Sequence, residues 1–359
     1  MIDPGLVQYA PKNRHLLVAI QENISLKPYN SFGIDALARY FAPFGTEEEL
    51  EEILDMTLPG PLMVLGGGSN LLFTKDFNGL VLKNEISGIA ELHEDNEYVY
   101  VRAGAGENWH QFVQYCIGRG WAGAENLSLI PGNVGATPMQ NIGAYGVEIE
   151  DIFWDLEAYH IREKRKVTFT NVDCEFGYRE SIFKKKYRDQ FVILNVTYRL
   201  RKHPRFNTSY GAIEAELERM GVKELSLELV SQAVINIRRS KLPDPMVIAN
   251  AGSFFKNPEV SVAKYEQLLT EHPSIIAYHL TNGNVKLAAG WLIEHCGPES
   301  GISWKGFRRG SVGCHERQAL VLVNYGGAKG EAIYQLSEDI LQSVKTTFGV
   351  MLEREVNIL

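Results

Sequence analysis

The sequence predicts a protein of the α+β class with more than one domain. The chain has 359 residues, more than the ~100–200 residues of a typical single domain. Hydrophobic residues make up 45% and charged residues 22% of the chain, which is the balance of a folded globular protein. Segments with the apolar period of a helix and segments with that of a strand both occur, and their order is mixed.

The N-terminal part begins without a clear period. Residues 1–25 are predicted to form an irregular leader. Thr46 and Glu49 have the Thr-x-x-Glu spacing of a capping box, and apolar residues follow at helical spacing, so a helix is predicted after Thr46. Short strands are expected at three segments rich in apolar, β-branched or aromatic residues, of which the first is predicted to be buried: residues 63–65, 80–82 and 98–101.

The middle of the chain continues the mixed order. Apolar residues share one helical face over Trp109–Ile117, and Gly118 and Gly120 are expected to end this helix. The region 149–200 is rich in strand-forming residues, and its strongest strand is predicted at 192–198.

Two prolines within residues 241–245 predict a domain edge. Beyond it we expect a helix at 286–294, loops and strands at 301–323, and a terminal helix at 331–348 that Gly349 ends. The tail alternates like a strand, so Glu353 points away from a face of apolar residues made of Val350, Leu352, Val356 and Ile358.

The composition argues against several classes of protein. The formal net charge is -8 with acids and bases interspersed, so no nucleic-acid partner is expected. The four cysteines form no Cys-x-x-Cys pair and the nine histidines no His-Glu-x-x-His motif, so no metal site is expected. The N-terminus is unlike a signal peptide, and no apolar run approaches ~18 residues. We expect a cytoplasmic protein with free thiols and no membrane contact.

Two glycine-rich segments, residues 64–70 and 130–146, could hold a phosphate group. In such loops backbone N–H groups converge on phosphate oxygens, and a flat ring can approach bare backbone. Neither has a Rossmann fingerprint, because Trp109 stands where a third glycine would follow Gly104 and Gly106. The chain has no P-loop motif and no Gly-x-Ser-x-Gly motif. Each loop alone is either a tight turn or a cofactor site.

A third segment, residues 249–258, places Ser253 after a glycine and before two phenylalanines. The glycine permits a close backbone approach, and the aromatic pair would anchor the loop and fix the Ser253 hydroxyl. The alternative is an ordinary turn that leads into a buried Phe pair.

Several separated motifs together resemble the UDP-N-acetylenolpyruvoylglucosamine reductase family, also called UDP-N-acetylmuramate dehydrogenase. The resemblance runs from about Leu26 to the last residue, and one small departure is Asn133, where a smaller residue would be expected. The segments that carry it are residues 30–35, 65–72, 126–146, 176–184, 241–245, 252–258 and 352–356.

The resemblance implies the two-part FAD-binding fold of the vanillyl-alcohol-oxidase type, with an α+β substrate-binding domain. The loop around Tyr210 resembles the subclass that closes a tyrosine over the substrate. The implied division is a leader at 1–25, FAD-binding subdomains at 26–88 and 89–242, a substrate-binding domain at 243–348, and a C-terminal strand at 349–359 that returns to the active site.

The family also implies a reaction. NADPH would give a hydride to N5 of a non-covalently bound FAD, and the flavin would reduce UDP-N-acetylglucosamine enolpyruvate to UDP-N-acetylmuramate for peptidoglycan synthesis. Ser253 would donate the proton, and Arg179 and Glu353 would stabilise the enolate. Glu353 could also protonate the enol if burial raises its pKa. Taken alone, Arg179 would be part of a solvated face and Glu353 an edge-strand charge.

The resemblance implies binding residues as well, and no metal ligand among them. FAD would contact Gly66, Gly67, Gly68, Ser69, Asn70, Pro131, Gly132, Asn133, Gly135, Ala136, Gln140, Asn141, Gly143, Ala144 and Tyr145. The substrate or the nicotinamide nucleotide would contact Tyr178, Tyr210, Arg238, Lys241, Asn257 and Gln318.

Two rival functions stay open. One is a flavin oxidase on the same fold, although the first glycine loop ends in Ser69-Asn70 and has no histidine to tether a flavin. The other is an inactive sugar-nucleotide-binding protein. We expect a monomer, but the sequence leaves open the oligomeric state and the preference for NADPH over NADH.

Overall fold

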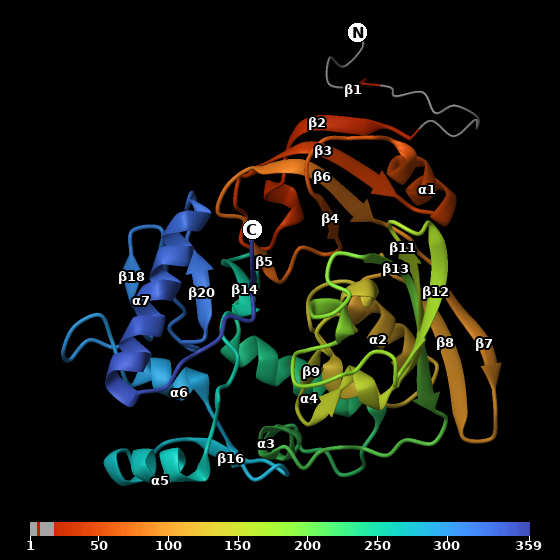
Figure 1. Cartoon of the computed structure of the whole chain (residues 1–359). Coiled ribbons are helices and arrows are strands. Elements are labelled where there is room, and N and C mark those ends of the chain that lie inside the picture. Colours follow the sequence, from red (N-terminus) through yellow and green to blue (C-terminus); the bar gives the residue numbers. More distant parts are fainter. Residues whose placement is uncertain (1–5, 8–17) are drawn as a thin grey trace. The chain divides into compact units, whose positions relative to one another are not determined.

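The computed structural model describes residues 6–7 and 18–359, which fall into two compact units (Figure 1). Unit 1 comprises Met1–Ile24, Leu37–Gly67 and Phe77–Ser240, and unit 2 comprises Ser25–Ala36, Gly68–Asp76 and Lys241–Leu359. Each unit therefore combines segments that are far apart in the sequence.

Unit 1 contains a five-stranded sheet of order β1-β2-β3-β6-β4, in which β6 pairs in parallel with β3 and β4. The strands are β1 (Leu6–Val7), β2 (Ile20–Ser25), β3 (Leu37–Phe44), β4 (Leu62–Leu65) and β6 (Phe77–Asn84). The expected irregular leader is therefore wrong for residues 20–25, because this segment completes its backbone hydrogen bonds in the sheet. The leader's residues 1–5 and 8–17 lie outside the described residues.

The predicted helix after Thr46 is confirmed as α1 (Glu47–Asp55). The Thr46 hydroxyl accepts a hydrogen bond from the backbone N–H of Glu49 at 3.2 Å. The Glu49 carboxylate accepts one from the N–H of Gly45 at 2.6 Å, one residue before the usual capping-box partner. Leu50 and Ile53 then pack into the core below β3 and β6.

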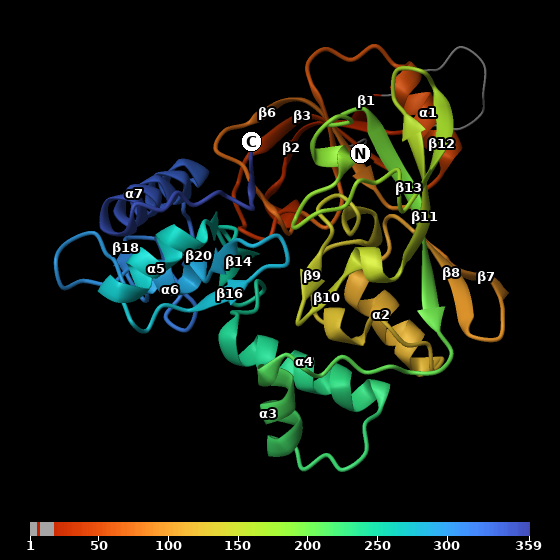
Figure 2. The same cartoon turned by 60° about the horizontal axis from the view of Figure 1, so that its bottom comes forward.

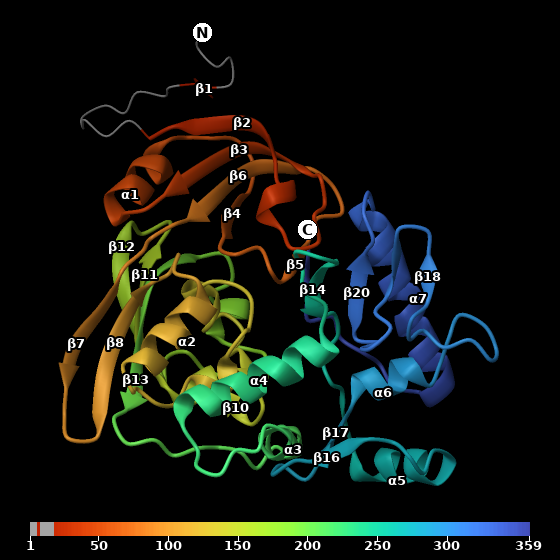
Figure 3. The same ribbon diagram turned by 180° about the vertical axis from the view of Figure 1, so that it is seen from behind.

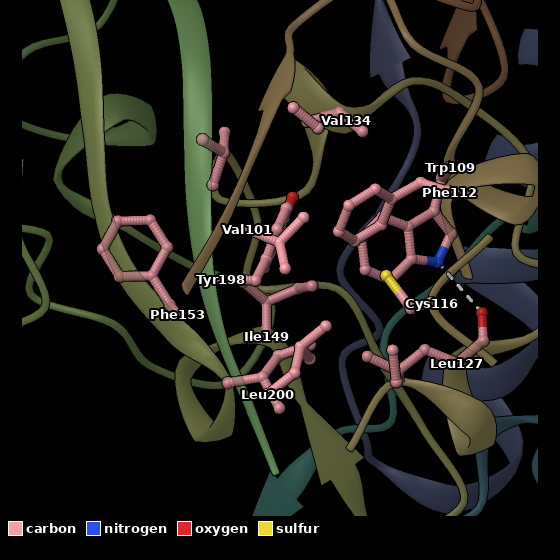
Figure 4. Close-up of a cluster of buried hydrophobic side chains, with 14 of the residues drawn as sticks. Val101, Trp109, Phe112, Cys116, Leu127, Val134, Ile149, Phe153, Tyr198 and Leu200 are labelled. Carbon is pink, nitrogen blue, oxygen red and sulfur yellow. Dashed lines mark hydrogen bonds between the residues drawn. The ribbon is translucent and has the colours of Figure 1, made fainter. Parts of the chain in front are cut away.

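The second sheet of unit 1 is antiparallel and has the order β12-β11-β13-β8-β7. It confirms the strands predicted at 98–101 and within 149–200. Helix α2 (Trp109–Gly118) packs Trp109, Phe112 and Cys116 into its core beside Tyr198 (Figure 4). The strands are β7 (Ile89–Glu94), β8 (Tyr98–Gly104), β11 (Phe153–His160), β12 (Arg165–Thr170) and β13 (Phe191–Arg201).

The rest of unit 1 consists of short elements and two helices. The helices α3 (Gly211–Arg219) and α4 (Leu227–Lys241) pack on each other through Ile213 and Val234 (Figure 2). The short elements lie before, within and after the second glycine-rich segment. They are η2 (Glu125–Leu127), η3 (Val134–Ala136), β9 (Gly143–Ala144), β10 (Val147–Glu148), η4 (Ile149–Asp151) and η5 (Ile182–Lys184).

Unit 2 is built on the sheet β14-β20-β19-β18, against which α7 packs (Figure 3). The predicted terminal helix is confirmed as α7 (Gly330–Phe348), and Gly349 caps it in the left-handed conformation with φ 63°. The strands are β14 (Ala249–Ser253), β18 (Arg308–Arg309), β19 (Val312–Cys314) and β20 (Val321–Asn324).

A smaller sheet of order β15-β17-β16 corrects the helix predicted at 286–294. Residues 285–287 form the central strand of this sheet, so the helix α6 covers only Ala289–Glu294. The other elements of unit 2 are η1 (Lys27–Tyr29), β5 (Leu71–Leu72), β15 (Glu259–Val260), α5 (Val262–Glu271), β16 (Ala277–His279), β17 (Val285–Leu287) and β21 (Asn357–Ile358).

The tail follows the predicted alternation of burial, since Val350, Leu352 and Val356 are buried and Glu353 is exposed. Only its end is a strand, because β21 pairs in parallel with β5. Among the described residues no helix is long and apolar enough to cross a membrane, and no group of His, Cys, Asp and Glu could hold a metal ion. All four cysteines are free and buried.

Candidate active site

A cavity of about 170 Å³ lies within unit 1 and is lined by both glycine-rich segments. Strand β4 forms one wall, which corrects the prediction of a buried strand at 63–65. Only Leu65 is buried, and Met63 and Val64 face the cavity instead of a packed core. The lining residues are Leu62, Met63, Val64, Gly66, Asn84, Ala105, Gly135, Ala136, Met139, Ile161, Asp189, Phe191 and Ile193.

The two segments approach each other so closely that side chains are excluded. A Cβ atom on Gly67 would lie 2.9 Å from the Cα atom of Gly132 and 2.7 Å from Oδ1 of Asn133. A Cβ atom on Gly135 would lie 2.6 Å from the Cβ atom of Ala105. Both glycines are therefore required by the backbone approach, and both loops present bare peptide groups near the cavity.

The end of the first loop belongs to unit 2. Gly68 has φ 62°, and a Cβ atom there would lie 1.9 Å from the carbonyl oxygen of Tyr29. The Asn70 side chain donates to the carbonyl of Glu355 at 3.3 Å, and the N–H of Asn357 donates to the Asn70 carbonyl at 3.1 Å. Gly68 thus closes a tight turn, and Asn70 holds the C-terminal tail.

The second loop binds Arg179. Its Nη2 atom donates to the carbonyl of Gly143 at 2.6 Å, and its Nη1 atom lies 3.6 Å from Oε1 of Glu148. The Glu148 carboxylate also accepts a hydrogen bond from Asn141 at 2.8 Å. The predicted residues Asn141, Gly143 and Arg179 are therefore brought together, with Glu148 as a link that the sequence did not reveal.

A second guanidinium lies near Arg179. Arg238 is half-buried, and its Nε atom donates to the carbonyl of Leu129 at 3.2 Å. Burial lowers the pKa of Arg238, the neighbouring Tyr145 opposes this shift, and the charge of Arg179 adds to it. The Tyr145 ring meets Tyr210 edge to face with centroids 5.5 Å apart. Two cations and two phenols in one cluster suit an anionic ligand that bears several oxygens.

Ser253 ends β14 in unit 2, at an irregularity of the β14–β20 register that follows Asn250. Gly252 before it has φ 69°, which a residue with a side chain rarely adopts. Phe254 and Phe255 after it are buried with ring centroids 5.3 Å apart. This confirms that the aromatic pair anchors the loop, so Ser253 sits on a fixed backbone.

The C-terminal tail returns to this loop. The N–H of Lys256 donates to the carbonyl of Glu353 at 2.8 Å, and the N–H of Glu355 donates to that of Phe254 at 2.9 Å. The Lys256 ammonium lies 2.6 Å from Oε1 of Glu353. Glu353 is exposed and its carboxylate pairs with an ammonium group. It therefore lacks the buried environment that a proton-donating carboxyl group was expected to have.

The remaining predicted residues are more dispersed. Asn257 accepts a hydrogen bond from the N–H of Ala289 at 2.9 Å, and Oε1 of Gln318 lies 2.8 Å from where a Cβ atom of Gly290 would stand. Each of these two residues therefore lies beside the first turn of α6. Lys241 is exposed at the end of α4, and the Tyr178 ring lies 5.1 Å from the Arg179 guanidinium carbon.

A larger hollow of about 840 Å³ lies in unit 2 beside α7. It is lined by residues 294–304, Arg309 and the α7 face around Ser343. None of the predicted site residues lines it, so it is not the candidate site.

Sequence reasoning missed Lys256 and Glu148. A single lysine or glutamate is usually solvated, and the partner of each is defined only by folding. The signal available for Lys256 was its position three residues after Ser253 in the same motif.

Comparisons with known proteins identify the domains of the chain. The pattern of the UDP-N-acetylenolpyruvoylglucosamine reductase C-terminal domain matches residues 244–359, and that of an FAD binding domain matches residues 38–159. These matches and the mixed architecture confirm the predicted fold class.

Curated relatives are similar over nearly the whole chain. The UDP-N-acetylenolpyruvoylglucosamine reductase of Amoebophilus asiaticus is 50% identical over 342 residues, covering 95% of this chain and 99% of the relative. That of Flavobacterium johnsoniae is 48% identical over 341 residues, with the same coverage of 95% and 99%.

A solved structure supports the fold. The crystal structure of the reductase from Thermus caldophilus has a TM-score of 0.61 at 22% identity, and the match covers 93% of this chain and 97% of that one. On the identity to the curated relatives over nearly its full length, the chain belongs to the UDP-N-acetylenolpyruvoylglucosamine reductase family.

Proposed function

We propose that this FAD-binding oxidoreductase uses NADPH to reduce UDP-N-acetylglucosamine enolpyruvate to UDP-N-acetylmuramate in the cytoplasm. The observation that carries the proposal is the hydrogen bond from Arg179 to Gly143. It ties a group that can hold a carboxylate to the same glycine-rich segment that lines the cavity of unit 1.

The lining of the cavity suits a part of a non-covalent FAD. Gly66 and Gly135 in the lining, and Gly67 next to Gly66, offer bare backbone to phosphate oxygens, and β4 with Phe191 offers an apolar wall to a flat ring. When bound, FAD would accept a hydride from NADPH and pass it to the terminal carbon of the enolpyruvyl double bond. The remaining proposed contacts come from Gly68, Ser69, Asn70, Pro131, Gly132, Asn133, Ala136, Gln140, Asn141, Gly143, Ala144 and Tyr145.

Arg179 is assigned to the negative charge that develops on the carboxylate side of the enolpyruvyl group. A guanidinium stays ionised and can hold two carboxylate oxygens at once. Its bond to Gly143 fixes one edge of the guanidinium in advance, so little reorientation is needed when charge develops.

Ser253 is assigned as the proton donor to the carbon that carries this charge, and Glu353 helps to stabilise the enolate. A hydroxyl is a weak acid, so it can protonate only a basic and well-aligned carbon. The fixed backbone around Ser253 supports the assignment because it limits the motion of the hydroxyl.

The anionic diphosphate is assigned to Arg238, with Tyr210 closing over the substrate as in the tyrosine-loop subclass. Tyr210 is 41% exposed, which leaves it accessible to a ligand. Substrate or nucleotide contacts are proposed for Tyr178, Tyr210, Arg238, Lys241, Asn257 and Gln318. A monomeric protein and the division into FAD-binding and substrate-binding parts complete the proposal.

Anaerobic stopped-flow spectroscopy of the FAD-loaded protein tests the function. NADPH is expected to bleach the flavin absorbance, and the enolpyruvyl sugar nucleotide is expected to restore it. Bleaching without recovery would reject the substrate, and a protein that binds no flavin would reject the cavity as a cofactor site. Acid treatment should release the flavin, since no covalent tether is proposed.

A further inference from the structure

Lys256 is unusual for a lysine because only 8% of its side chain is exposed. An ammonium group removed from water requires hydrogen-bonded partners of opposite charge. One such partner is Glu353, whose Oε1 atom lies 2.6 Å from the lysine Nζ atom and whose side chain is 69% exposed. The pair therefore joins a buried cation to a carboxylate that a ligand can reach.

The backbone fixes both members of the pair. The N–H of Lys256 donates to the carbonyl of Glu353, and Phe255 forms a β-bridge with Arg354. Arg354 in turn donates to the Ser337 hydroxyl at 2.9 Å and to Glu338 at 2.7 Å on α7. The tail is thus anchored on the residue directly after Glu353, which keeps the Glu353 backbone beside Lys256.

We propose that Lys256 is a positioning residue for Glu353, holding its carboxylate in one orientation and cancelling its charge. The inference rests on the proposed function, in which Glu353 faces a developing enolate. An isolated carboxylate would repel that enolate, whereas a carboxylate paired with an ammonium adds no net charge. The charge of the ammonium thus offsets the repulsion that the Glu353 carboxylate would exert on the negative transition state.

The variant Lys256→Met tests the inference in the full-length, FAD-loaded protein, because it keeps the length of the side chain and removes its charge. We expect flavin reduction by NADPH to stay within about twofold of the parent rate, and reoxidation by the enolpyruvyl sugar nucleotide to slow about 10²-fold, the lower range of a proton-handling residue. Adding Glu353→Gln to Lys256→Met should cost little more, because the two residues act as a unit.

The matched control is Lys305→Met. Lys305 also lies 2.6 Å from a glutamate carboxylate, that of Glu294, but its side chain is 34% exposed. We expect this variant to keep both half-reactions at the parent rate.

Lys256→Arg separates positioning from a purely structural role, and it also serves if Lys256→Met does not fold. Arginine keeps a cation beside the Glu353 carboxylate. We expect reoxidation by this variant to recover to near the parent rate. Reoxidation as slow as that of Lys256→Met would overturn the inference.

Parent-rate reoxidation by Lys256→Met would also overturn the inference, as would equal loss in both half-reactions or fully additive effects of Lys256→Met and Glu353→Gln. These results would leave the proposed function intact. A parent protein that the enolpyruvyl sugar nucleotide does not reoxidise would instead reject the proposed function and the role of Lys256 with it.

Discussion

Arg179 itself, and Gly252 directly before Ser253, have a backbone conformation that is rare for residues with side chains. Arg179 has φ 57°, and a non-glycine residue in this region costs roughly 1–2 kcal/mol. The turn that contains it is closed by two backbone hydrogen bonds of 3.1 Å between Gly177 and Glu180. Gly252, directly before Ser253, has φ 69°, which glycine adopts without this cost. At Arg179 the surrounding hydrogen bonds offset the strain, which is typical of residues at functional sites.

Ser253→Ala tests the proposed role of the Ser253 hydroxyl as proton donor. The variant removes one hydroxyl from a half-buried position and leaves Phe254 and Phe255 in place. Flavin reduction by NADPH should keep its parent rate, and reoxidation by the enolpyruvyl sugar nucleotide should fall by about 10²–10⁴-fold. Stopped-flow measurement of the two half-reactions checks this, and a similar loss in both would contradict the role of Ser253 as proton donor.

The cysteines provide a residue-scale test of packing. Burial raises the pKa of Cys174 and of Cys314 to about 12 and also raises the pKa of Cys116 and Cys296. A raised thiol pKa leaves little thiolate at pH 8, and the thiolate is the reactive form. A chromogenic disulfide reagent should therefore label the native chain slowly and all four cysteines after denaturation. Rapid labelling of the native chain at pH 8 would contradict the described burial.

At the scale of elements, the sequence predicted what local chemistry determines. The helices after Thr46 and before Gly349 were found because their caps are read from adjacent residues. Residues 286 and 287 were assigned to a helix because the pairing of β17 with β15 and β16 is a tertiary feature. Strand β2 was missed for the same reason. The helices α3 and α4 were not predicted, although their apolar residues recur at helical spacing.

A side chain added to the second glycine-rich segment at Gly135 is expected to weaken FAD binding. Gly135→Ala would put a Cβ atom 2.6 Å from the Cβ atom and 3.1 Å from the carbonyl oxygen of Ala105. Because neither atom of Ala105 can retract without moving the end of β8, the second glycine-rich segment should shift away from Ala105, and we expect FAD affinity to fall at least about tenfold. Titration of the apoprotein with FAD, followed by flavin fluorescence, measures this change.

Gly118→Ala is the matched control for this substitution. A Cβ atom on Gly118 would meet nothing within 4 Å, and alanine favours the helix α2 by roughly 1 kcal/mol over glycine. FAD affinity should stay at the parent value. Parent affinity in the Gly135→Ala variant as well would show that the loops do not hold the cofactor.

At the scale of the whole molecule, the chain enters and leaves unit 2 twice before Lys241. The motifs located Arg179, Ser253 and Glu353 along the sequence, but their partners depend on this interleaving. Lys256 and Glu353 are 97 residues apart, and Asn70 and Glu355 are 285 apart. No periodicity or cap links positions at such separations, so the ion pair and the anchoring of the tail required the folded chain.

FAD is expected to stabilise unit 1 in particular, because the candidate cofactor cavity lies within that unit. A ligand at 100 times its Kd stabilises the state that binds it by about 2.7 kcal/mol. For a unit of the size of unit 1 this corresponds to a rise in Tm of roughly 5–10 °C. Addition of FAD to the apoprotein should therefore raise the Tm of unit 1, and calorimetry measures this change. In the Gly135→Ala variant the same FAD concentration should produce a smaller shift, and an equal shift in both proteins would place FAD outside the cavity lined by Gly66 and Gly135.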